Sequence, residues 1–123
     1  MKTAPSKCDE DADSSQFKKV AAIVRIDVLK KVEQALQGLH VPGVSVTKVK
    51  GYGEYSNFFR SDWMVESARI EIFVRRERAK EIARAIIDAA HSGIPGDGLV
   101  VISSVEAVYR IRSKELATPD ELG

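Results

Sequence analysis

The sequence predicts an α+β domain in which an antiparallel sheet carries two helices on one face, because the order strand, helix, strand occurs twice along the chain. Two observations carry most of this prediction. In residues 68–74, apolar residues alternate strictly with charged or aromatic ones, which is typical of a strand with one face on a core. In residues 79–90, apolar residues recur every three or four positions, which is typical of an amphipathic helix. The repeated unit indicates the split βαβ, or ferredoxin-like, arrangement.

The first unit begins with an apolar, β-branched run at residues 20–26, which predicts a buried strand. Asp27 then stands where a helix N-cap would accept the free N–H groups of the next turn. The helix that follows ends near Gly38 and is predicted by a stripe of apolar residues: Leu29, Val32, Leu36 and Leu39. After a turn, residues 44–52 alternate well enough to form a second strand.

The second unit follows residues 53–66, which have no clean period and are predicted to form a long loop. Ser92 and Gly93 are expected to stop the helix at 79–90, and residues 99–102 and 107–111 to supply the closing strands. Alternation in the strand at 68–74 leaves three side chains on the face away from the helices: Arg69, Glu71 and Phe73. Another subunit commonly covers such a face, so we expect an oligomer.

The composition favours one compact cytoplasmic domain. The chain has 123 residues, 30% of them charged, and a formal net charge of only +1, so no global field points to nucleic acid or to an anionic membrane. The single cysteine, Cys8, excludes an internal disulfide and fits a reducing compartment. Residues 1–16 are small, polar and acidic and are expected to be a disordered tail without a signal peptide. No later segment has the length of a membrane span.

One part of the sequence has the residue types of a phosphate site. Residues 92–98 are rich in glycine, which lets backbone N–H groups approach an anion closely. Arg110 and Arg112 are predicted to lie on one face of a strand, where their guanidinium groups would match phosphate oxygens. The alternatives are an ordinary Gly-Asp-Gly turn and a solvated strand face.

With these residues placed, the chain resembles the PII signal-transduction superfamily over residues 17–115. Three stretches carry the resemblance: PGVSVTKVKGYG at 42–53, ARIEI at 68–72, and the Gly-Asp-Gly turn at 96–98 together with VEAVYRIR at 105–112. The resemblance implies a homotrimer of ferredoxin-like subunits with adenine nucleotides in the clefts between neighbours. It also implies that the loop at 53–66 inserts into a target protein, and it leaves residues 116–123 as a C-terminal tail.

The resemblance assigns nucleotide-binding roles to individual residues. The adenine and ribose pocket would include Gly43, Val44 and Ser45, with the purine lined by Glu71 and Phe73. The phosphates would lie near the base of the loop at Gly51 and Gly53, and would meet backbone donors of Gly96, Asp97 and Gly98. The adjacent subunit would contribute Arg110 and Arg112.

The chain departs from the family pattern at several of these positions. Leu99 stands where a phosphate-binding lysine follows the turn, which implies that ADP or AMP binds at least as well as ATP. Tyr55 replaces a glutamine that helps to hold magnesium and 2-oxoglutarate, and Ser67 replaces a lysine that pairs with 2-oxoglutarate. Phe59 falls at or near the position of the uridylylated tyrosine. Sensing of 2-oxoglutarate and control by uridylylation are therefore not expected, and a role for magnesium stays open.

The aromatic residues of the loop are expected to contact a protein target, such as a membrane transporter or a metabolic enzyme, or else to pack back on the trimer: Tyr55, Phe58, Phe59 and Trp63. An enzyme is not expected, because no nucleophile, base pair or metal cluster converges in the sequence. The alternatives on the same trimeric scaffold are a metal-tolerance protein and a nucleotide hydrolase. An RNA-binding domain ranks last, because the sheet lacks a basic face with stacking aromatics.

Overall fold

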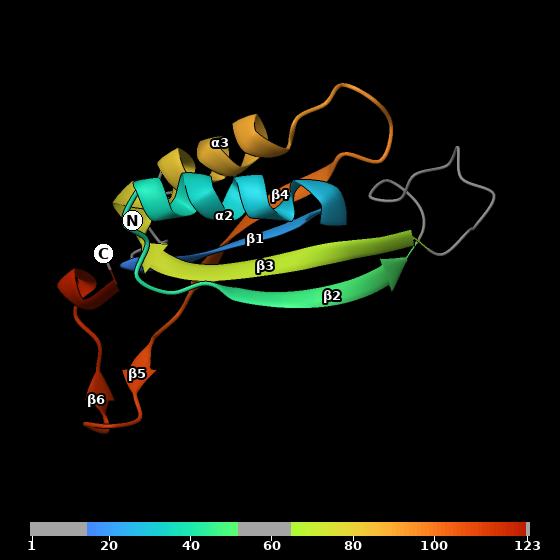
Figure 1. Cartoon of the computed structure of the whole chain (residues 1–123). Coiled ribbons are helices and arrows are strands. Elements are labelled where there is room, and N and C mark those ends of the chain that lie inside the picture. The colour runs from blue at the N-terminus through green and yellow to red at the C-terminus, as the bar shows by residue number, and fades with distance from the viewer. Residues whose placement is uncertain (1–14, 52–64, 123) are drawn as a thin grey trace, which may run out of the picture.

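A computed structural model describes residues 15–51 and 65–122, which form a four-stranded antiparallel sheet with two helices packed side by side on one face (Figure 1). The strands, in chain order, are β1 (Phe17–Arg25), β2 (Ser45–Gly51), β3 (Val65–Arg75) and β4 (Gly98–Val105). The helices are α2 (Leu29–Gly38) and α3 (Ala79–Ala90). The order β2-β3-β1-β4 places β1 and β3 at the centre, so the predicted ferredoxin-like fold is confirmed.

The core lies between the sheet and the helices, and the alternation of β3 builds one side of it. Its inward residues are fully buried: Ala68, Ile70, Ile72 and Val74. The helices contribute the residues of their predicted stripes, namely Val32 and Leu36 from α2, and Ala79, Ile82, Ala83, Ile86 and Ala90 from α3. Burial of each large aliphatic side chain stabilises the fold by about 1.5–3 kcal/mol. The helical and strand periods seen in the sequence therefore arise from one shared core.

The predicted N-cap at Asp27 is wrong. A 3-10 turn, η1 (Ile26–Val28), separates β1 from α2, and the residue that precedes α2 is Val28, which makes no side-chain capping bond. The Asp27 carboxylate instead accepts hydrogen bonds from Arg25. The second unit repeats this design, because η2 (Arg76–Arg78) separates β3 from α3.

The C-terminal part of the chain also differs from its prediction. The strand expected at 107–111 is reduced to β5 (Tyr109–Arg110), which pairs with β6 (Glu115–Leu116) and not with the main sheet. Residues 116–122 are not a free tail. Ala117 is buried and its N–H donates to Val108 O at 2.8 Å, and η3 (Pro119–Leu122) lies against β3. In Figure 1 the β5-β6 hairpin extends away from the main sheet.

The sheet face opposite the helices carries apolar side chains that the single chain leaves exposed. Phe73 on β3 is 45% exposed, and on β4 Leu99 and Val101 are 39% and 48% exposed. The strand register places Leu99 opposite Ile23 and Val101 opposite Ala21 on β1. Leu99, Val101 and their β1 neighbours therefore form an exposed apolar group, and the Lys19–Glu71 ion pair lies between this group and Phe73.

Candidate functional site

A hollow of about 580 Å³ opens at the β2 edge of the sheet, where the chain enters this strand. The register places Ser45 of β2 opposite Glu71 of β3, and β5 brings Arg110 to the same place. The hollow is lined by Pro42, Gly43, Val44, Ser45, Glu71, Phe73 and Arg110. All of these except Pro42 are residues that the resemblance assigned to nucleotide binding. The fold therefore gathers three separate parts of the sequence at one place.

The walls of this hollow combine apolar surface with charge. Phe73 and Val44 are 45% and 38% exposed and provide apolar surface. The Glu71 carboxylate lies 3.5 Å from Lys19 Nζ, and Arg110 contributes a guanidinium group. A small ligand that joins a flat heterocycle to polar or anionic groups fits this combination of surfaces.

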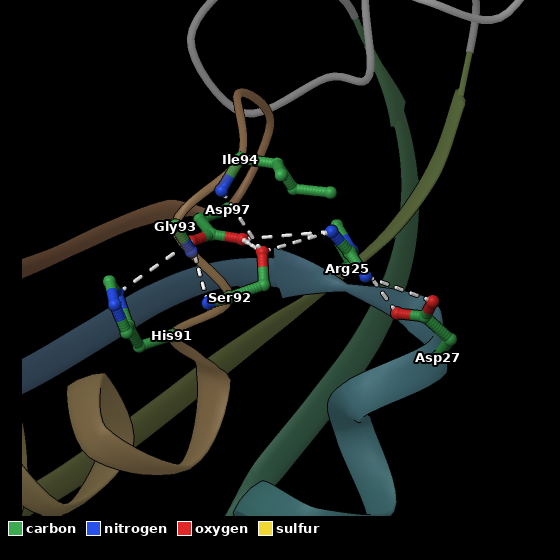
Figure 2. A network of polar contacts seen from close by, with 7 residues as sticks. All are labelled: Arg25, Asp27, His91, Ser92, Gly93, Ile94 and Asp97. Atoms are coloured by element: carbon green, nitrogen blue, oxygen red, sulfur yellow. Dashed lines mark hydrogen bonds and ion pairs between the residues drawn. The ribbon is translucent and has the colours of Figure 1, made fainter.

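The glycine-rich turn between α3 and β4 is organised around the Asp97 carboxylate (Figure 2). This carboxylate accepts hydrogen bonds from the N–H groups of Ser92 and Gly93, both at 2.9 Å, and from the Ser92 hydroxyl. Gly93, Gly96 and Gly98 all have positive φ values, of 89°, 96° and 105°. The Asp97 side chain thus closes the turn on itself and accepts the N–H groups of Ser92 and Gly93.

Arg25, at the end of β1, connects this turn to the start of the first helical segment (Figure 2). Its Nε and Nη2 donate to the two carboxylate oxygens of Asp27, each at 3.2 Å. Its Nη1 donates to Ser92 Oγ at 3.3 Å and lies 3.6 Å from Asp97 Oδ1. His91 Nδ1 lies 3.9 Å from Asp97 Oδ2. One guanidinium group therefore contacts two carboxylates and a hydroxyl.

These contacts change the pKa values of Asp97 and Arg25. Partial burial raises the pKa of Asp97, but hydrogen bonds from Ser92 and Gly93 and the positive charge of Arg25 outweigh it, so the pKa lies below the usual value of an aspartate. The hydrogen bond with Asp27, together with the charges of Asp27 and Asp97, raises the pKa of Arg25 against the opposing effect of burial. Both shifts favour the charged forms of Asp97 and Arg25.

We expect Asp97→Asn to lower the free energy of unfolding by about 1–2 kcal/mol at pH 7, because the amide loses the charge-assisted bonds of the carboxylate. The pKa of Asp97 is lower in the folded chain, so its stabilising contribution is complete above the unfolded-state pKa of about 3.9 and is lost as the pH falls through the folded-state pKa. Urea unfolding at a series of pH values should show the difference shrinking in acid. A constant difference at every pH, or an equal loss in the exposed control Asp88→Asn, would contradict this role.

The hollow and the turn lie far apart within one chain. The hollow is at the β2 edge, whereas the turn leads into β4 at the opposite edge, with β3 and β1 between them. Three strand spacings correspond to about 14 Å. The hollow and the turn also lie at different positions along the strands, because Gly98 pairs with Val24 of β1 whereas Ser45 pairs with Glu71 of β3. Asp97 and Gly98 border a second hollow, of about 280 Å³, beside α3. One chain therefore holds two separate groups of the predicted residues.

The structure places the remaining predicted residues differently. Arg110 and Arg112 do not share a strand face, because β5 ends at Arg110 and residues 111–114 form a turn, closed by the Lys114 N–H donating to Arg110 O at 2.8 Å. Gly51 ends β2 opposite Val65, at the base of the predicted loop. The described residues do not include Gly53 or the predicted partner-binding aromatics Tyr55, Phe58, Phe59 and Trp63.

Sequence reasoning included Ser92 in the glycine-rich stretch at 92–98 but missed Arg25, which contacts it. They are separated by 67 positions, and each has an ordinary local explanation, as the polar end of a strand and as a helix stop. Nothing in their spacing predicts their contact.

Two kinds of feature are not found among residues 15–51 and 65–122. None of the helices there is long and apolar enough to cross a membrane. The same ranges contain no group of three or more histidine, cysteine, aspartate or glutamate side chains placed to hold a metal ion.

Comparisons with known proteins agree with this fold. The sequence model of the family "Nitrogen regulatory protein P-II" matches residues 17–115. The chain is 34% identical to the nitrogen regulatory protein P-II of Rhizobium meliloti (strain 1021), over 80% of this chain and 95% of that protein. It is 37% identical to the P-II protein of Cyanidium caldarium, over 80% of this chain and 94% of the relative.

A solved structure shows the same likeness in three dimensions. The crystal structure of Arabidopsis thaliana PII bound to citrate superposes with a TM-score of 0.71 at 32% identity, and the match covers 85% of this chain and 88% of that one. The family model and the relatives cover most of both sequences, and the solved structure has the same fold. The chain therefore belongs to the P-II family of regulatory proteins.

Proposed function

We propose that this chain is a cytoplasmic signalling regulator that binds an adenine nucleotide between the subunits of a homotrimer and passes its state to a protein target. The observation that carries the proposal is the hollow at the β2 edge, which gathers the residues of the expected adenine pocket with Arg110. The exposed Phe73 ring provides an apolar surface for a purine, and Glu71 and the backbone near Ser45 provide polar partners.

The phosphates of this ligand would meet the glycine-rich turn of a neighbouring subunit. Within one chain the turn lies at the opposite sheet edge from the hollow, so a second copy is needed to bring a turn to a hollow. Arg110 would then stand between the purine and the phosphates, where a guanidinium group binds phosphate oxygens strongly. A cyclic homotrimer gives every subunit the same pair of neighbours and closes the arrangement.

The preferred nucleotide would be ADP or AMP, at least as much as ATP. Leu99 follows the turn and offers an aliphatic side chain where a lysine would contact the phosphates. Each lost charge-assisted bond weakens binding by about 1–3 kcal/mol, which falls mainly on the terminal phosphate. The target would be engaged through the segment at 53–66, and a membrane transporter is the class of partner that we propose.

We expect Arg110→Ala to weaken nucleotide binding by about 1–3 kcal/mol, or roughly 5–150-fold, while the oligomer stays intact. The test is isothermal calorimetry with AMP, ADP and ATP, with and without magnesium, combined with sedimentation velocity. The control is Arg84→Ala, which removes an exposed arginine from α3. Unchanged affinity in Arg110→Ala would remove this residue from the site. Steady phosphate release from ATP by the parent chain would favour a hydrolase.

A further inference from the structure

Resting on the proposed function, we propose that Arg25 is a positioning residue for the glycine-rich turn, which we call the phosphate turn and define as residues 92–98. Arg25 would act through Asp97 and Ser92 to hold the backbone donors of this turn toward the nucleotide phosphates. Neither the sequence motifs nor the hollow at the β2 edge includes Arg25. The inference rests on the contacts in Figure 2.

The first step is that the phosphate turn needs an external anchor. Its three glycines with positive φ give the unconstrained backbone many accessible conformations. The bonds from Ser92 and Gly93 to Asp97 close the turn internally, and the pairing of Gly98 with Val24 ties its last residue to the sheet, whereas Ser92 and Gly93 at its start need a connection of their own. Arg25 supplies that connection, since it belongs to the central strand β1 and donates to Ser92 Oγ at 3.3 Å.

The second step is that Arg25 is itself held in place. Its Nε and Nη2 both donate to Asp27, which leaves Nη1 directed at Ser92 and Asp97 (Figure 2). The Arg25 and Asp97 side chains are 21% and 25% exposed, so water screens this pair only in part. A planar guanidinium group can donate to Asp27 and to Ser92 at the same time, whereas the ammonium group of lysine is a single point charge.

The third step is electrostatic. Asp97 puts a negative charge into a turn that is proposed to receive phosphates, and the pKa of Asp97 is lowered. Arg25 lies 3.6 Å from this carboxylate and offsets its charge. Without Arg25, the turn would be less ordered and its carboxylate would repel the ligand. Both effects act on phosphates and leave the purine pocket at the other sheet edge untouched.

The internal repeat of the fold offers a matched control. Arg75 ends β3 and precedes η2, as Arg25 ends β1 and precedes η1. Arg75 also pairs with an aspartate, since its Nη1 lies 3.6 Å from Asp120 Oδ1. The register places Arg75 opposite Phe17 and Arg25 opposite Ser67, so the two arginines lie at opposite ends of the sheet. Arg75→Gln removes the same charge from the equivalent position, away from the phosphate turn.

The experiment compares the parent chain, Arg25→Gln, Arg25→Lys and Arg75→Gln by calorimetric titration with adenosine, AMP, ADP and ATP. In Arg25→Gln we expect unchanged adenosine affinity and a loss that grows with phosphate number, about threefold to tenfold for ADP. Arg25→Lys should lose less, because an ammonium group can keep one partner. Arg75→Gln should match the parent with every ligand. Thermal unfolding verifies that each variant is folded.

Arg25→Gln affinities equal to those of the parent, or an equal loss for adenosine and ADP, would overturn the inference. A second readout needs no ligand: amide hydrogen exchange at Ser92 and Gly93 should be faster in Arg25→Gln than in Arg75→Gln. Unchanged exchange would also overturn the inference. If the parent chain binds none of the nucleotides, the proposed function fails, and the exchange rates still decide whether Arg25 positions the turn.

Discussion

Gly98→Ala is expected to destabilise the fold by about 2–5 kcal/mol, because the site has no room for a side chain and an unfavourable backbone conformation for one. A Cβ atom on Gly98 would lie 1.9 Å from the carbonyl oxygen of Ile23 and 2.9 Å from its carbonyl carbon. These atoms belong to the central strand β1, so they cannot move aside as a flexible side chain would. The φ of 105° adds strain for any L-residue other than glycine.

Urea and thermal unfolding measure this effect directly, and Gly38→Ala is the matched control. Gly38 ends α2 and has no atom within 4 Å of an added Cβ, so alanine there should change the free energy of unfolding by less than about 1 kcal/mol in either direction. Equal stability of Gly98→Ala and Gly38→Ala would show that the close approach of β4 to β1 is not a constraint. The glycine after Asp97 is thus explained by strand packing, independently of any ligand.

Val101→Asp is expected to dissociate the proposed homotrimer into monomers. Val101 is 48% exposed on the uncovered sheet face, close to the half-buried Ala21 and near Leu99. If copies of the chain cover this face, each copy would place an unpaired carboxylate in an apolar interface, which costs several kcal/mol per copy. The same variant should lose nucleotide binding, because the two groups of site residues would no longer meet.

Sedimentation velocity tests this prediction, with Gln34→Asp on the exposed side of α2 as the control. The control should sediment like the parent chain, and Val101→Asp should sediment as a folded monomer with an unchanged circular dichroism spectrum. A Val101→Asp variant that keeps the parent's mass would show that this sheet face is not the interface.

The parts of the fold that could be predicted from sequence are those where a buried face imposes a period. Residues 68–74 alternate because one side of β3 packs under the helices, and the stripe of α3 is the matching surface. When a strand pairs only with residues close by in the chain, no buried face imposes a period on its sequence. Residues 107–111 were predicted as a strand of the main sheet, but β5 pairs with β6, only a few residues further along the chain.

The candidate site was predictable as a set of residues but not as an arrangement. Motifs pointed to Ser45, Glu71, Gly98 and Arg110, and only the strand order shows that Gly98 lies apart from the others. The contact between Arg25 and the phosphate turn spans 67 positions and depends on two loops meeting at one end of the sheet. Asp27 shows the same limit. Its position in the sequence predicts a helix N-cap, but its carboxylate accepts hydrogen bonds from Arg25 instead.

The measurement that tests the central claim most directly is a complementation experiment between two defective chains. Arg110→Ala damages the hollow, and Ile94→Glu places a carboxylate in the phosphate turn at a side chain that is 50% exposed and lies off the sheet face, so each chain alone should bind ADP weakly. When the two are unfolded together and refolded as mixed oligomers, some clefts combine an intact hollow from one chain with an intact turn from the other. Our account predicts that calorimetry recovers a fraction of sites with the parent's ADP affinity. Mixed oligomers that bind no better than either variant alone would contradict a site shared between subunits.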